Sequence, residues 1–290
     1  MKRSNKGLGW LGGRALLYVC MGLTLLYIFA PLAWLFISSI STRAELLEVP
    51  PHWWPNAPTL QNYLDIISPG EDTSRAARDF GAALMNSIII STAVTVISLA
   101  VGSVAAYAFA RLHFRFRRSG LLAIVALRML PGVSVVIPLY VILRDAALLN
   151  KRHALILLYL SFTLPFVIWI MASFFQSIPS ELEDAARIDG CSRFGALRRV
   201  IMPVSLPGLV ATGVFAFLLA WDEFFFALLF TSTPAAKTVP VAIAEFTGRH
   251  AIDFSAQATG GVLAAIPPVL LALVFQRYIV RGLTAGAVKG

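Results

Sequence analysis

The chain has 290 residues, of which 58% are hydrophobic and 13% are charged. Soluble domains contain about 25% charged residues, so this composition excludes an ordinary soluble protein and indicates an integral membrane protein. The net charge of +9 could suggest nucleic-acid binding. However, the basic residues lie in short segments beside apolar runs, where such residues set the orientation of a membrane protein.

Basic residues occupy an N-terminal tail at 1–14, and an apolar run follows at about 15–40. A cleaved signal peptide would have an apolar core of about 7–15 residues. Because this run is much longer, we expect a retained first transmembrane helix at 15–40, bent by Pro31. The next segment, 41–80, is polar and rich in proline, which predicts an extracytoplasmic loop with short helices.

Five further apolar runs follow, at about 81–109, 120–143, 154–175, 209–230 and 258–280. Each is about 20 residues or longer, which is enough to cross a hydrocarbon core of about 30 Å. The sequence therefore predicts an all-α polytopic membrane protein with six transmembrane helices. The first helix would precede a five-helix core over 81–280, and residues 281–290 would form a C-terminal tail.

Six transmembrane helices place both termini on the same side of the membrane. That side would carry 15 Lys and Arg residues and the other side 8, with Arg128 inside a span. Because Lys and Arg are enriched on the cytoplasmic side, we expect both termini and the central loop at 179–207 to be cytoplasmic.

The central loop, 179–207, is the longest charged interruption between two apolar halves of the chain. Ser180 followed by Glu183 three positions later predicts a helix that begins with a capping box. Gly190 is expected to end this helix. Ser192 is expected to cap a second helix.

The first of these helices would place Leu182, Ala185 and Ala186 on one face, where two alanines allow close approach of another surface. Pro203 and Pro207 are expected to stop the second helix. From the residues alone, the loop is either a solvated connection or a docking element for another protein.

Three charged residues, Arg128, Asp222 and Glu223, fall inside expected spans. An unpaired charge facing lipid costs at least about 2.5–3.5 kcal/mol at the bilayer centre, so these side chains should face the protein interior or water. Pairing of Arg128 with one of the acids is the simplest hypothesis. Such a pair could fix two helices together, or the charges could serve as a gate or a substrate contact.

Several kinds of site are missing from the sequence. It contains no G-x-x-x-x-G-K-[ST] phosphate loop, so ATP that drives this protein would be hydrolysed on another chain. The four histidines lack metal-ligand spacing, and Cys20 and Cys191 are not expected to pair. We therefore expect no metal, no bound cofactor and no catalytic residue on this chain.

The central loop resembles the conserved cytoplasmic loop of permease subunits of binding-protein-dependent ABC importers. The family pattern is Glu-Ala-Ala, three residues, Gly, nine residues and Ile-x-Leu-Pro. The matching positions here are Asp184, Ala185, Ala186, Gly190, Val200, Met202 and Pro203. Asp replaces Glu, Val replaces Ile and Met replaces Leu.

Two other stretches share the resemblance. The segment WDEF at 221–224 is similar to a Trp-Asn-Glu-Phe stretch of the family, with Asp222 at the usual Asn position, and the closing segment 282–290 is also similar. Together these motifs resemble the second permease of carbohydrate importers of the maltose-transporter type.

The resemblance implies a type I ABC importer permease fold in a bacterial or archaeal cytoplasmic membrane. It also implies four kinds of partner: a second permease subunit, an ATPase dimer that binds ATP and Mg, an extracytoplasmic sugar-binding protein and the lipid bilayer. The segment 231–257 would meet the binding protein. The loop 179–207 would dock on the ATPase through Glu181, Leu182, Glu183, Asp184, Ala185, Ala186, Asp189 and Gly190.

Candidates for the pathway or its gate are Arg128, Trp221, Asp222 and Glu223. An alternative function stays open at this point. An ion-gradient-driven secondary transporter or channel could use Arg128, Asp222 and Glu223 as proton or ion sites.

Overall fold

The computed structural model describes residues 6–50, 52–71, 73–247 and 252–285. Within these ranges every named element is helical, and the only β-type pairing is an isolated bridge between Thr247 and Ile252. The predicted all-α fold is confirmed. The chain forms two compact units, one of residues 1–78 and 246–263 and the other of residues 79–245 and 264–290.

The first unit contains the long helix α1 (Lys6–Ser39), the short turn η1 (Glu45–Leu47) and helix α2 (Gln61–Ile67). The end of α1 is fixed by polar contacts. The Ser39 hydroxyl lies 2.7 Å from the Tyr63 hydroxyl, and the Asn62 amide donates to the Ser39 carbonyl at 2.9 Å. The short helices predicted within 41–80 are confirmed.

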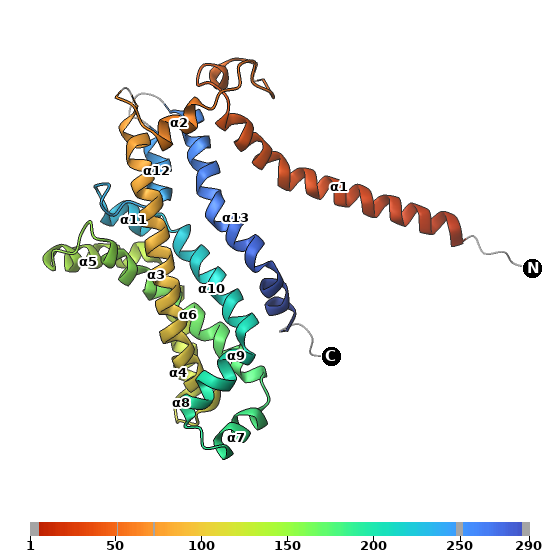
Figure 1. The fold of residues 1–290 in the computed structure, drawn as a ribbon, viewed down its shortest axis with the longest axis vertical. Helices are drawn as coiled ribbons and strands as arrows, with labels where there is room; N and C mark the ends of the chain where they lie inside the picture. Colours follow the sequence, from red (N-terminus) through yellow and green to blue (C-terminus); the bar gives the residue numbers. More distant parts are fainter. Residues whose placement is uncertain (1–5, 51, 72, 248–251, 286–290) are drawn as a thin grey trace, which may run out of the picture. The chain divides into compact units, whose positions relative to one another are not determined.

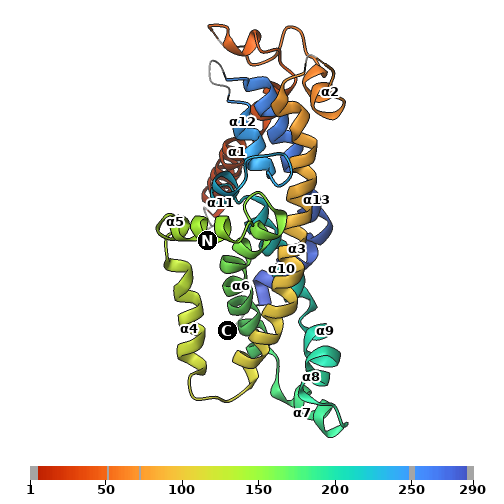
Figure 2. The ribbon, with the colours of Figure 1, turned by 90° about the vertical axis from the view of Figure 1, so that its left-hand side faces the viewer.

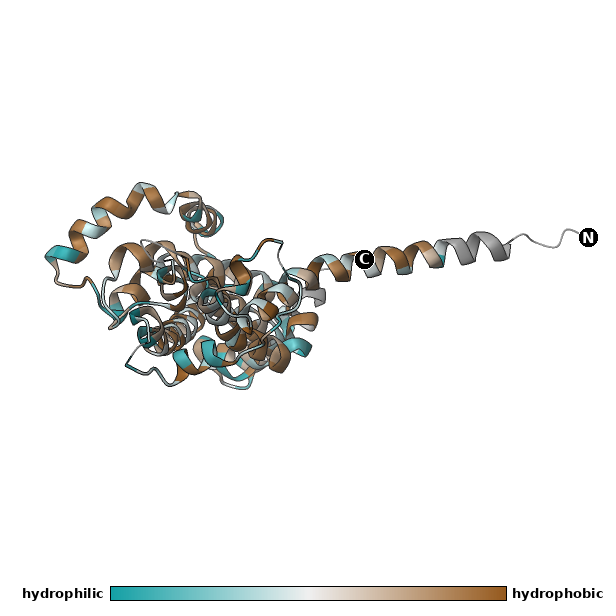
Figure 3. Ribbon diagram, turned by 90° about the horizontal axis from the view of Figure 1, so that it is seen from above, coloured by the Kyte–Doolittle hydropathy of each residue, from teal (hydrophilic) through white to brown (hydrophobic). Residues whose placement is uncertain are grey.

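The second unit contains most of the remaining helices. They are α3 (Arg75–Arg111), α4 (Arg117–Ala126), η2 (Leu127–Met129), α5 (Gly132–Asp145), α6 (Arg152–Ser177), α7 (Ser180–Ile188), α8 (Arg193–Ala196), η3 (Leu197–Ile201), α9 (Met202–Val204), α10 (Leu206–Trp221), α11 (Phe225–Phe230), α12 (Val239–Glu245) and α13 (Phe254–Ala285). Helices α3 and α13 begin in the first unit and continue into the second. Hydrophobic residues predominate along the helices (Figure 3).

Four described helices, α1, α3, α6 and α13, are long and apolar enough to cross a membrane. The number rises to six when each of two bent helix pairs is counted as one span. One bent pair falls within an expected continuous span, and the other falls at the end of the central loop.

The expected third span is wrong as a continuous helix, because the chain turns by 88° between η2 and α5. Leu130 and Pro131 both have extended backbone at this turn. Proline disfavours helical geometry in the residue before it. The bend therefore follows from Pro131.

The second bend, of 82°, lies between α9 and α10 at Ser205. As the sequence predicts, the helix that starts after Ser192 ends between Pro203 and Pro207, because the helical run Arg193–Val204 stops before Ser205. Pro207 itself lies in the first turn of α10. Proline is tolerated there because the N–H it lacks would have no intrahelical partner. The expected fifth span, 209–230, is also broken, because α10 ends at Trp221 and α11 starts at Phe225.

Two apolar clusters form the core of the second unit. One includes Ile90 of α3, Leu155 and Tyr159 of α6, and Phe230 of α11. The other includes Tyr107 of α3, Met171 and Phe175 of α6, and Leu197 and Ile201 of η3. Helices α3 and α6 contribute to both clusters, so they form the frame that positions the loops at either end.

Two glycines allow close helix contacts within this frame. A Cβ atom at Gly208 of α10 would lie 2.7 Å from Cγ and Cδ1 of Phe174 in α6. A Cβ atom at Gly102 of α3 would lie 2.7 Å from Cγ1 of Val167, also in α6. Small residues at such contacts are typical of helices packed within membranes.

We predict that Gly208→Ala lowers the thermal stability of the purified protein in detergent, by about 1–3 kcal/mol, because the added methyl group overpacks against the base of the Phe174 ring. The matched control is Gly81→Ala in α3, where a Cβ atom would meet no atom within 4 Å. That change should stabilise the helix by about 0.5–1 kcal/mol. Equal melting temperatures for the two variants would contradict the close contact.

Candidate functional site

Helix α7 lies with α8 at one end of α3, whereas α11 and α12 lie toward the other end (Figures 1 and 2). The backbone of Ile178 and Pro179 is extended, so α6 and α7 are separate helices joined by a two-residue link. The predicted capping box is wrong. The helix begins at Ser180, its N-cap is Pro179, and no side chain caps it.

The Glu183 side chain points into the protein rather than back toward the start of α7. Its carboxylate accepts a hydrogen bond of 2.5 Å from the Tyr107 hydroxyl and lies 3.5 Å from Nε of Arg111. Both charged side chains are only 12% exposed. The Arg111 guanidinium also donates to the Ile178 carbonyl at 2.6 Å. These contacts, which we call the Glu183 latch, tie α7 and the α6–α7 link to α3.

Gly190 ends α7 in the way the sequence predicts. Its φ is +85°, a left-handed conformation that glycine adopts without strain. The Gly190 N–H donates to the Arg187 carbonyl, and the Cys191 N–H donates to the Ala186 carbonyl. These two bonds form a Schellman motif. The predicted cap at Ser192 is confirmed, because its hydroxyl accepts from the Gly195 N–H at 3.1 Å.

The eight candidate docking residues divide into two groups. Glu183 and Ala186 are buried within this chain. The expected face of Leu182, Ala185 and Ala186 is therefore divided, since only Leu182 and Ala185 are exposed. The exposed candidates are Glu181, Leu182, Asp184, Ala185, Asp189 and Gly190.

Ile188 extends the exposed apolar face of α7, because it follows Leu182 and Ala185 at three-residue spacing and is 86% exposed. A leucine, an alanine and an isoleucine on one side of a helix, flanked by acidic residues, form a surface suited to another protein.

The four pathway candidates do not form one charged cluster. Among the described residues, Arg128 makes no ion pair, and its guanidinium carbon lies 5.3 Å from the ring centre of Phe166. The hypothesis that Arg128 pairs with Asp222 or Glu223 is wrong for this structure. Its charge is stabilised instead by the face of an aromatic ring.

The Glu223 carboxylate accepts hydrogen bonds from the Phe226 and Ala227 N–H groups, at 2.9 and 3.2 Å. It therefore caps the start of α11, where N–H groups lack helical partners. Asp222 follows α10 directly and is exposed. Trp221 is 3% exposed and stacks on Phe217, so it contributes to packing within the chain.

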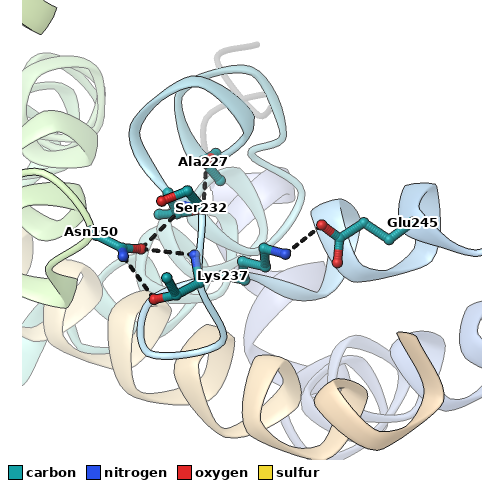
Figure 4. A network of polar contacts seen from close by, with 7 residues as sticks. Asn150, Ala227, Ser232, Lys237 and Glu245 are labelled. Atoms are coloured by element: carbon teal, nitrogen blue, oxygen red, sulfur yellow. Dashed lines mark hydrogen bonds and ion pairs between the residues drawn. The ribbon is translucent and has the colours of Figure 1, made fainter. Parts of the chain in front are cut away.

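The segment after α11, residues 231–238, is held by polar side chains (Figure 4). The Asn150 side-chain oxygen accepts from the Ser232 and Thr233 N–H groups, both at 3.1 Å, and its amide donates to the Thr233 hydroxyl at 2.7 Å. Lys237 pairs with Glu245 of α12. This segment is therefore ordered by specific contacts.

Helix α3 holds the same segment from its buried side. The Asn86 amide donates to the Pro234 and Lys237 carbonyls, both at 2.9 Å. The Ser87 hydroxyl accepts from the Val239 N–H at 2.8 Å. Asn86 and Ser87 are 0% and 2% exposed.

Sequence reasoning missed Tyr107, Arg111, Asn86 and Asn150. A signal existed for the first two, because a tyrosine and an arginine spaced by four residues share one face at the end of an apolar helix. For Asn86, the available signal was an amide within an apolar span, which in lipid requires a partner.

Comparison with known proteins gives consistent matches. Residues 98–285 match the family model described as binding-protein-dependent transport system inner membrane component. The sulfoquinovosyl glycerol transport system permease protein SmoH of Agrobacterium fabrum is 38% identical, over 96% of this chain and 95% of that protein. The trehalose/maltose transport system permease protein MalG of Thermococcus litoralis is 39% identical, over 90% of this chain and 91% of that protein.

The fold is also similar to that of a solved structure, a bacterial ABC transporter involved in the import of the acidic polysaccharide alginate. The TM-score is 0.75 at 21% identity, with 96% of this chain and 98% of that chain covered. The similarity establishes a common fold.

We predict that Glu183→Lys destabilises the purified protein by about 3–5 kcal/mol, because it places a second cation beside the buried Arg111 and removes its partner. The matched control is Glu181→Lys, two residues away on the exposed surface of α7, which should change stability by no more than about 0.5 kcal/mol. Thermal unfolding in detergent measures both changes. Similar losses in the two variants would contradict the buried latch.

Proposed function

Since this chain belongs to the family of binding-protein-dependent transport system inner membrane components, we propose that it carries a sugar through the membrane as one half of the pathway of an ABC importer. The chain is a multi-pass membrane permease, and its relatives and structural neighbours are ABC importer permeases. They support this function and not an ion-gradient-driven transporter or channel.

The sugar is proposed from the names of the relatives. Those proteins are named for sulfoquinovosyl glycerol and for trehalose and maltose, and the solved structure is of an importer of alginate. All of these compounds are carbohydrates. In our proposal a second permease completes the pathway, and an extracytoplasmic binding protein delivers the sugar near the segment 231–257, of which residues 248–251 lie outside the described part of the chain. Arg128 and Asp222 remain candidates for contact with the pathway.

The observation that carries the coupling role is the two-sided character of α7. One side presents Leu182, Ala185 and Ile188 to the outside, and the other side is fixed to α3 through Glu183. A helix with a free docking face and a fixed inner face can pass on the motion of a partner. We propose that an ATPase on separate chains, which bind ATP and Mg²⁺, docks on this face from the cytoplasm.

Closure of the ATPase pair would then move α7 and reorient the membrane helices, a rigid-body transition of the kind found in many switching proteins. ATP drives such a change only if it binds one state of the complex better than the other. In this proposal both chain termini lie in the cytoplasm, and the bias of Lys and Arg supports that orientation.

We predict that Gly190→Leu abolishes ATP-dependent sugar uptake, because a branched side chain strains the left-handed backbone at the end of α7 and displaces the docking face. Uptake is measured in vesicles that contain the complete transporter. Gly190→Asn is the matched control, since asparagine tolerates this conformation better, and it should retain most of the uptake.

Membrane insertion should be normal in both variants, because residue 190 lies outside the long apolar helices. Uptake that proceeds without ATP, or normal ATPase co-purification and transport by Gly190→Leu, would contradict the proposed coupling.

A further inference from the structure

Helix α3 has polar clamps at both of its ends within the second unit. At one end Asn86 and Ser87 hold the segment 231–239. At the other end Tyr107 and Arg111 hold α7 and its link to α6. We infer that α3 is a strut that mechanically connects the segment 231–239 with the coupling helix α7, so that movement of either one displaces the other.

The clamps lie far enough apart to act on opposite sides of a membrane. Asn86 and Tyr107 are separated by 21 positions, which corresponds to about 32 Å along a helix. This length matches a hydrocarbon core of about 30 Å. Asn86 and Arg111 are 25 positions apart, about seven turns, so they lie on the same side of α3.

The composition of α3 suits it for this role better than that of the other long helices. Of the four long apolar helices described, α1, α6 and α13 contain proline, at Pro31, Pro165 and the pair Pro267–Pro268. Helix α3 contains none over 37 residues. Proline removes a backbone hydrogen bond and creates a site where a helix bends. Of these four helices, α3 is therefore the one whose backbone hydrogen bonds are not interrupted by proline.

Helix α6 offers a rival connection, because Asn150 lies two residues before its start and α7 follows its end after a two-residue link. Two features weaken that route. Pro165 interrupts the helix, and the extended link at Ile178 and Pro179 separates it from α7. The Ile178 carbonyl is itself bound by Arg111, so α3 also fixes this link.

The side chains of the strut are well placed for transmission. Asn86, Ser87, Tyr107 and Glu183 are all buried, with exposed fractions of 9% or less. When a buried hydrogen bond breaks, no water replaces the lost partner, so the donor and the acceptor are left unsatisfied at a cost in free energy. Movement of α7 therefore either carries α3 with it or leaves these groups without partners.

The inference rests on the proposed function, because it assigns the route between the proposed ATPase-docking helix and the proposed binding-protein segment. The test uses the complete transporter, purified with its co-expressed subunits in lipid nanodiscs. Hydrogen exchange of the amides in 231–239 is measured with and without Mg–ATP. In the wild type, Mg–ATP should change the exchange of these amides, although they lie at the far end of α3.

Glu183→Gln and Tyr107→Phe should each abolish this response at 231–239, and so should Asn86→Ala. Tyr107→Phe removes a single hydroxyl, which keeps the test usable if the Glu183 variant fails to assemble. Combining Tyr107→Phe with Asn86→Ala should add nothing to either change, because both interrupt one route. Glu181→Gln, on the exposed face of α7, should keep the full response.

Asn150→Ala tests the rival route through α6, and the response should survive it. Loss of the response in Asn150→Ala, with retention in Asn86→Ala, would overturn the strut. So would a full response in both Glu183→Gln and Tyr107→Phe. A wild-type complex that hydrolyses ATP and takes up sugar but shows no change at 231–239 would overturn the strut alone, whereas one without ATP-driven uptake would overturn the proposed function as well.

Discussion

The structure of the central loop depends on one buried carboxylate. Glu183 lies in a nine-residue helix that is joined to α6 only through an extended link. Its contacts with Tyr107 and Arg111 fix the angle of that helix. A buried acid beside an arginine is costly unless its hydrogen bonds are completed. Here the Tyr107 hydroxyl donates that hydrogen bond. The same contacts therefore stabilise the buried carboxylate and hold α7 against α3.

Features governed by neighbouring residues were predictable from sequence. The apolar spans, the end of α7 at Gly190 and the cap at Ser192 all depend on residues within one or two helical turns. The bends were less accessible. Pro131 breaks a span, whereas Pro31 and Pro165 lie inside helices. Residue type alone therefore does not decide whether a proline ends a helix or lies inside one.

Long-range contacts could not be derived from one sequence. Tyr107 and Glu183 are 76 positions apart, and Asn86 and Lys237 are 151 apart. The acidic start of α7 predicted a local cap, but a partner on α3 took the carboxylate instead. Similarly, Glu223 suggested an ion pair within the membrane, but the free N–H groups of α11 lie closer along the chain and bind it.

The division of α7 into an inner and an outer side has an evolutionary consequence. In the proposed coupling, the exposed residues Leu182, Ala185 and Ile188 would select the partner surface, whereas the contacts of Tyr107 and Arg111 with Glu183 hold α7 at its angle. These two sets of residues lie on different helices and do not overlap. If an ATPase docks on α7 as proposed, partner choice and docking angle can therefore diverge independently among homologous subunits, and a new ATPase can be accommodated without a change in the membrane helices.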